Sequence, residues 1–113
     1  MSNFSNFDET LAQAPLVLTE GAIVERLRRE QHVPLHPSLV NAPLIYDEVT
    51  SGAMADIYRQ YYELGCRAGL PMMTLTPTWR ANAERLAASE FAGRNLNGDC
   101  LWYLNGLRAE CGE

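Results

Sequence analysis

The chain has 113 residues, of which 47% are hydrophobic and 20% charged, and its formal net charge is −5. This size and composition predict one globular domain, or a piece of a larger one, and argue against a largely disordered chain. The nine basic residues are all arginines and form no basic block, which disfavours nucleic acid and anionic membranes as partners. No apolar run approaches the roughly 20 residues of a membrane span, and the start carries no secretory signal, so we expect a cytoplasmic protein.

The cysteines and histidines do not form the spacings typical of a metal site. The three cysteines are Cys66, Cys100 and Cys111. Because no two of them are close in sequence, neither a disulfide scaffold nor a zinc knuckle is expected, and all three are predicted to be buried thiols. His32 and His36 are four residues apart, but Pro34 between them disfavours the helix that would bring them together.

The first half of the chain predicts a strand, a helix and a long loop. Residues 1–14 are polar and predict a flexible lead-in. The apolar run 16–19 predicts a short buried strand. Apolar side chains on one face then predict a helix from residue 23 to 29, supported by the Glu25–Arg29 pair at i,i+4. Residues 31–50 contain three prolines and predict an ordered loop, a kind of segment that is often functional.

The second half predicts a long helix, a second strand and two more helices. Apolar residues at three and four spacing predict a helix over 51–68, capped by Ser51 and ended by Gly69. Residues 72–76 predict a second short buried strand. Asn82 is expected to cap the next helix, and Asn95 or Asn97 the last one. The apolar face of that last helix is predicted to contain Cys100, Leu101, Leu104, Leu107 and Cys111.

Two apolar strands separated by helices predict a parallel pair joined by a right-handed crossover. The fold class is therefore α/β, with two parallel strands and covering helices. Because a sheet of two parallel strands is not expected to be stable alone, residues 15–113 are predicted to form the first part of a larger sheet, open or closed.

Polar residues follow both predicted strands at the point where each strand ends. Glu20 and Gly21 follow the first strand, and Thr76 and Thr78 lie at the end of the second. Ligands of parallel α/β proteins bind at this end of the strands, so these four residues are the candidate substrate-binding set. Glu20 is suited to an ammonium group, but it is equally a solvated turn residue; the two threonine hydroxyls either contact ligand or stabilise a turn.

Three segments resemble the homocysteine S-methyltransferase family. The first is residues 18–27, LTEGAIVERL, similar to the family's opening motif of an acidic residue, Gly-Gly or Gly-Ala, and Glu-Leu on a helix. The second is residues 73–82, MTLTPTWRAN, similar to the family's Thr-Asn-Thr-aromatic stretch after its second strand. The third is residues 57–69, IYRQYYELGCRAG, similar to the helix that ends in Ala-Gly between them. The resemblance covers only the opening portion of the family.

The resemblance implies the N-terminal portion of a (β/α)₈ TIM barrel and a methyltransferase of methionine biosynthesis. The complete enzyme would transfer a methyl group from a small donor to a thiol, homocysteine or a similar compound, with the help of zinc bound by three cysteines. Those cysteines belong to later strands of the family, so the resemblance assigns no metal ligand and no catalytic residue to this chain. It places Glu20 near the substrate amino group and Gly21 and Thr76 beside it, and it implies that residues 1–113 alone are inactive.

Two other interpretations stay open at this stage. The chain could be a non-catalytic α/β interaction module that associates with itself or a partner through an exposed strand edge. Alternatively, it could be a small α/β domain whose helices fold back over the two strands.

Overall fold

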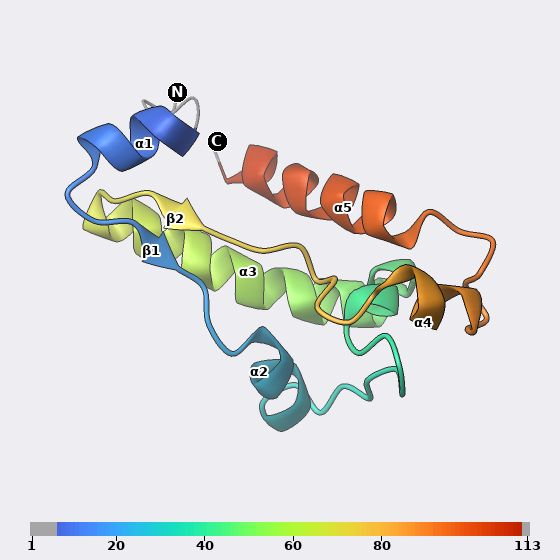
Figure 1. Cartoon of the computed structure of the whole chain (residues 1–113). Coiled ribbons are helices and arrows are strands. Elements are labelled where there is room, and N and C mark those ends of the chain that lie inside the picture. Colours follow the sequence, from blue (N-terminus) through green and yellow to red (C-terminus); the bar gives the residue numbers. More distant parts are fainter. Residues whose placement is uncertain (1–6, 112–113) are drawn as a thin grey trace.

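The computed structural model describes residues 7–111, and α3 is its central element (Figure 1). Helix α3 contacts η1, α2, α5 and β2. The elements in chain order are α1 (Phe7–Gln13), β1 (Leu18–Thr19), α2 (Ile23–Arg29), the 3₁₀ helix η1 (Ala42–Tyr46), α3 (Glu48–Ala68), β2 (Met72–Met73), α4 (Ala83–Ala87) and α5 (Leu96–Glu110). The structure is therefore α/β. No helix within residues 7–111 is both long enough and apolar enough to cross a membrane.

The two strands pair in parallel, as predicted. Leu18 lies opposite Met72 and Thr19 opposite Met73. The Leu18 N–H donates to the Pro71 carbonyl at 2.9 Å, and the Glu20 N–H donates to the Met73 carbonyl at 3.2 Å. This pairing places the carboxyl ends of both strands at the same edge of the sheet.

The strands are shorter and less buried than predicted. Each has two residues, where the sequence predicted 16–19 and 72–76. Leu16, the first residue of one predicted strand, and Leu75, the last apolar residue of the other, are 64% and 66% exposed. The prediction of buried strands is wrong because no third strand within the described part of the chain extends the ladder.

Helix α3 begins earlier than predicted and ends where predicted. Its N-cap is Asp47, whose carboxylate accepts a hydrogen bond from the Thr50 N–H at 2.9 Å. Ser51 is therefore not the cap, and its hydroxyl donates to the Glu48 carbonyl instead. Gly69 ends the helix with a φ of 66°, a conformation that glycine adopts without steric cost. The predicted loop 31–50 consequently includes η1 and the first turn of α3.

Helices also form at both ends of the described chain. Residues 7–13 of the predicted lead-in form α1, none of whose residues is buried, and residues 1–6 lie outside the described part. Asn82 caps α4 by accepting from the Arg85 N–H at 2.8 Å. Asn95, one of two predicted candidates, caps α5 by accepting from the Gly98 N–H at 3.3 Å.

Two clusters of buried side chains form the core. The larger one joins α2, α3 and α5 and includes Leu27, Met54 and Ile57. The second cluster consists of Leu39, Ala42, Ala81, Leu96 and Cys100. Cys100 is buried as predicted, whereas Cys111 is only partly buried. The prediction of burial is wrong for Cys66, which is exposed on α3, and for Leu101, which is 51% exposed on α5.

Candidate functional site

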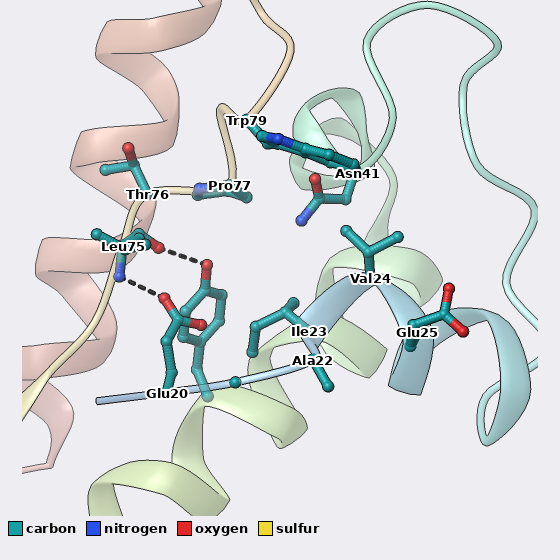
Figure 2. A pocket seen from close by; sticks show the side chains of 12 residues that line it. Glu20, Ala22, Ile23, Val24, Glu25, Asn41, Leu75, Thr76, Pro77 and Trp79 are labelled. Atoms are coloured by element: carbon teal, nitrogen blue, oxygen red, sulfur yellow. Dashed lines mark hydrogen bonds between the residues drawn. The ribbon is translucent and has the colours of Figure 1, made fainter. Parts of the chain in front are cut away.

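A pocket of about 370 Å³ lies at the carboxyl ends of the two strands (Figure 2). Its walls come from the β1–α2 connection, the segment after β2, helix α3 and the loop before η1. The lining residues are Glu20, Gly21, Ala22, Ile23, Val24, Glu25, Asn41, Tyr58, Leu75, Thr76, Pro77 and Trp79. Three of the four candidate residues predicted from the sequence, Glu20, Gly21 and Thr76, therefore meet at one pocket.

Glu20 is the half-buried carboxylate of this pocket. Its Oε1 accepts a hydrogen bond from the Leu75 backbone N–H, which ties the end of β1 to the segment after β2 (Figure 2). Burial raises the pKa of Glu20, and the Leu75 N–H opposes that rise in part. Glu20 is thus a half-buried residue of the turn before α2, and both its substrate-binding role and the alternative of a turn residue remain predictions.

The turn after Glu20 accepts a hydrogen bond from Tyr61 and contains a residue in a rare backbone conformation. The Tyr61 hydroxyl donates to the Gly21 carbonyl. The left-handed conformation falls on Ala22, with a φ of 56°, rather than on the neighbouring glycine. An alanine in this region costs about 1–2 kcal/mol more than in an ordinary helical conformation. The turn that opens α2 is thus strained on the pocket side.

The two threonines have different positions. Thr76 lines the pocket, whereas Thr78 is not among the lining residues. Their hydroxyl oxygens lie 2.8 Å apart, and the Thr78 N–H donates to the Thr76 carbonyl at 2.7 Å. The structure therefore supports the turn-stabilising alternative for Thr78, and Thr76 alone of the pair is placed to contact a ligand.

Sequence reasoning missed Asn41, which comes from the proline-containing loop. It is 3% exposed and lines the pocket, and Figure 2 shows its amide nitrogen pointing into the space between Pro77 and Val24, with the amide oxygen on the side of Trp79. The length of the loop indicated a functional segment, but no motif distinguished Asn41 within it. On the opposite side, Tyr58 positions the β2 side of the pocket by donating from its hydroxyl to the Leu75 carbonyl at 2.7 Å.

Trp79 forms the outer wall. It is 67% exposed, and the Arg80 guanidinium carbon lies 4.5 Å from the centre of its ring. Arg80 itself is not a lining residue. The ionisable groups of acidic or basic type that line the pocket are two carboxylates, Glu20 and Glu25. Arg28 and Arg29 pair with Glu25, which leaves Glu20 as the pocket carboxylate without an ion-pair partner in residues 7–111. The Glu20 charge favours neutral or cationic ligands with hydrogen-bond donors over anions.

The cysteines of residues 7–111 do not fit a three-thiolate zinc site. Within this range no three His, Cys, Asp or Glu side chains are grouped closely enough to hold a metal ion. Cys100 is buried, and burial together with the nearby Asp99 raises its pKa to about 12, which disfavours the thiolate that binds metal. His36, one of the two histidines considered as ligands, contacts Glu90 at 2.9 Å.

The comparisons with known proteins give no relative. The chain matches no family model, no curated protein and no solved structure. The pocket and the two strand ends that line it are therefore the features of this chain that bear on function.

Proposed function

We propose that this chain forms the substrate-binding part of a thiol methyltransferase similar to the homocysteine S-methyltransferases, built on the opening portion of a (β/α)₈ barrel. The main support for the proposal is that Glu20 and Thr76 line the same pocket. These residues are 56 positions apart by number, and each lies within one of the two strand-end motifs that resemble the family. Parallel strands bring such motifs to one edge of the sheet, where ligands of α/β proteins bind.

Glu20 is the residue proposed to bind the substrate amino group. Within residues 7–111 the Leu75 N–H is the one hydrogen-bond donor to its carboxylate, and that bond involves Oε1. Oε2 is therefore the oxygen for an ammonium group. A charge-assisted bond from an ammonium is about twice as strong as a neutral one, and the half-buried position strengthens it further.

The methyl transfer itself requires groups beyond those described. The substrate thiol loses its proton, its sulfur attacks the methyl carbon, and the donor leaves with the electron pair of its former bond to that carbon. In the family, zinc bound by three cysteines would lower the pKa of the substrate thiol so that it releases its proton to water, and the cysteines of residues 7–111 do not fit that zinc site. The described residues are accordingly proposed to bind and orient the thiol substrate, and no step is assigned to a metal in this chain.

The structure also favours a second candidate function, self-association through a strand edge. The sheet has two strands, and Leu16 and Leu75 beside them are 64% and 66% exposed. Unpaired strand edges with apolar neighbours are templates for pairing with another chain. A discrete dimer in size-exclusion chromatography, with no binding of small amines, would favour this interaction module over the methyltransferase.

Titration of the 113-residue chain with L-homocysteine by calorimetry or NMR tests the main proposal. We expect Glu20→Gln to weaken binding about tenfold, because the ammonium loses its ionised partner. Glu63→Gln is the matched control, because Glu63 is exposed on α3 and pairs with Arg67 outside the pocket. Equal affinities of wild type and Glu20→Gln would contradict the role of Glu20.

An activity assay gives an independent test. The chain alone, supplied with homocysteine, an onium methyl donor and zinc, is expected to form no methionine, because its described cysteines make no zinc site. Methionine formation by the chain without another polypeptide would overturn the proposal that the thiolate-forming site lies outside it.

A further inference from the structure

The amide nitrogen of Asn41 points into the pocket from the loop before η1. Figure 2 shows this nitrogen directed into the space between Pro77 and Val24, across the pocket from Glu20. Its one acceptor in the described part of the chain is the Met54 sulfur, 3.7 Å from Nδ2. A thioether is a weak acceptor, and an amide nitrogen carries two N–H groups. One N–H of Asn41 is therefore available to an acceptor atom of a ligand.

The fold gives no reason for an amide at this position. Asn41 is 3% exposed, and its Oδ1 has no hydrogen-bond partner within residues 7–111. Asn41 stands at the N-cap position of η1, but its side chain makes no capping hydrogen bond. A buried polar group without a partner costs about 1–3 kcal/mol, and a leucine of similar size would pack against Met54 without this cost. A contact outside the fold explains the amide, and Nδ2 is the atom directed toward one.

The loop that carries Asn41 holds this direction before any ligand binds. Val40 has a φ of 59°, a rare conformation for a β-branched residue, and two backbone hydrogen bonds of 2.9 and 3.1 Å join it to His36. The His36 Nδ1 also accepts from the Ser38 and Leu39 N–H groups, both at 3.1 Å. A donor fixed in this way binds its acceptor without a further cost of ordering the loop.

Glu20 and Asn41 have opposite hydrogen-bonding character on opposite sides of the pocket. Glu20 presents a carboxylate, whose Oε1 accepts from the Leu75 N–H, whereas Asn41 presents an N–H donor. Ile23 and Pro77 contribute apolar surface to the same pocket. The matching ligand therefore has an amino group at one end, an acceptor oxygen at the other and a short apolar chain between them.

We propose that Asn41 is a specificity-determining residue that selects small amines carrying a neutral carbonyl group, such as a carboxamide. Its Nδ2 donates to the carbonyl oxygen, while Glu20 binds the amino group at the other end of the ligand. This inference rests on the Glu20 contact of the proposed function and does not depend on methyl transfer.

A series of aminoamides tests the ligand class. The probes are 3-aminopropanamide, 4-aminobutanamide and 5-aminopentanamide, which differ in the length of chain between the amino and carbonyl groups. Each is compared with the alkylamine in which an isopropyl group of similar shape replaces the carboxamide; for 4-aminobutanamide this is 4-methylpentylamine. Dissociation constants would be measured by NMR titration of the 113-residue chain, following the backbone amides of Glu20 and Leu75. No binding of any aminoamide would overturn the proposal.

The decisive variant is Asn41→Leu, with Asn105→Leu as the matched control on the exposed side of α5. We expect Asn41→Leu to weaken the tightest aminoamide about fivefold and to leave its alkylamine unchanged or tighter, because only the carbonyl oxygen loses a hydrogen bond. Asn105→Leu should leave both constants unchanged, since Asn105 does not line the pocket. An equal effect of Asn41→Leu on the aminoamide and on the alkylamine would overturn the proposal.

The wild-type chain gives a second test that does not depend on the folding of any variant. The side-chain N–H protons of Asn41 should shift in the NMR spectrum when the aminoamide binds and shift less with the alkylamine, because only the aminoamide supplies an acceptor. Those of Asn105 should stay in place with both ligands. Equal shifts of the Asn41 protons with the two ligands would contradict the contact.

Homocysteine separates this inference from the proposed function. If the aminoamide shows both Asn41 effects and homocysteine does not bind, the methyltransferase proposal fails while the Asn41 contact stands. If homocysteine binds and the aminoamides do not, the Asn41 inference fails while the methyltransferase proposal stands.

Discussion

The loop before η1 contributes to two regions that differ in how their polar groups are satisfied. Leu39 and Ala42 are fully buried in the second cluster, whereas Asn41 between them lines the pocket. Around the second cluster, the Tyr46 hydroxyl donates to Asp99, and the Cys100 thiol donates to the Ala42 carbonyl at 3.6 Å. In the pocket, the Asn41 Oδ1 has no partner in residues 7–111.

This difference separates the part of the molecule that maintains the fold from the part that is available for binding. Paired polar groups around an apolar cluster contribute to stability in the unliganded chain. An unpaired buried acceptor and a half-buried carboxylate lower the stability of the folded chain. The same substitution should therefore have different consequences in the two regions.

The largest expected effect is on the second cluster. Leu96→Ala removes a fully buried side chain and should lower the free energy of unfolding by about 2–5 kcal/mol, because it creates a cavity. Leu75→Ala, on the pocket side, is the matched control and should change it by less than about 0.5 kcal/mol, since Leu75 is 66% exposed. Urea denaturation measures both. Similar losses for the two variants would erase the distinction between the regions.

The features that could be predicted from the sequence are those set by neighbouring residues. Gly69 and Asn82 were predictable as helix boundaries because a left-handed stop and a side-chain cap depend on a few adjacent positions. The parallel pairing followed from the helix between two apolar runs. The position of Glu20 at the strand-end pocket was predictable because Glu20 directly follows the first apolar run.

The features that could not be predicted depend on contacts between distant segments. Asn41 faces the pocket because Val40 adopts a positive φ within a turn closed by His36, and no sequence pattern announces a β-branched residue in that conformation. Asp47 rather than Ser51 caps α3, although both residue types are good caps. Cys66 is exposed because no element formed by residues 7–111 covers its side of α3, which the sequence of one helix does not reveal.

The second-largest effect on stability is expected at the paired polar groups beside the second cluster, Tyr46 and Asp99. Tyr46→Phe removes the hydroxyl that donates to Asp99 and should lower the free energy of unfolding by about 1 kcal/mol at pH 7. Burial and the Asp99 carboxylate raise the pKa of Tyr46 to about 12 from its ordinary value of 10.0. The folded chain thus keeps a proton that the unfolded chain loses, so stability falls as pH rises between these two values.

Denaturation at several alkaline pH values checks this dependence. Other tyrosines also titrate there, so the quantity to compare is the difference between wild type and Tyr46→Phe. We expect that difference to shrink as pH rises from 10 to about 12. A constant difference across this range would indicate that the Asp99 contact does not hold the proton of Tyr46.

A smaller effect is expected from relieving strain in the pocket turn. Ala22→Gly should raise the free energy of unfolding by about 0.5–1 kcal/mol, because glycine accepts a φ of 56° without the steric cost that alanine has. Ala53→Gly, in the middle of α3, is the control and should lower stability by about 1 kcal/mol. If both substitutions destabilise the chain, then Ala22 is not strained in solution.

The smallest expected effect is that of Glu20→Gln. At neutral pH this substitution should raise the free energy of unfolding, whereas Tyr46→Phe should lower it. Burial raises the pKa of Glu20 above its ordinary value of 4.5, so the folded chain binds this proton more tightly than the unfolded chain does. The free energy of unfolding therefore falls as pH rises from 4.5 through the folded-state pKa. Above that range Glu20→Gln should stabilise the chain, by less than about 0.5 kcal/mol because water screens a half-exposed carboxylate.

Thermal denaturation of wild type and Glu20→Gln at pH 4 and pH 7 measures this sign. The advantage of the variant should be present at pH 7 and smaller at pH 4, where the wild-type carboxyl is largely protonated in both states. Combined with weaker amine binding, a gain in stability would show that Glu20 is retained for a ligand at the expense of the fold. A loss of stability at pH 7 would instead make Glu20 a structural residue that links β1 to the Leu75 backbone, and the pocket would then resemble the second cluster in having its polar groups satisfied from within.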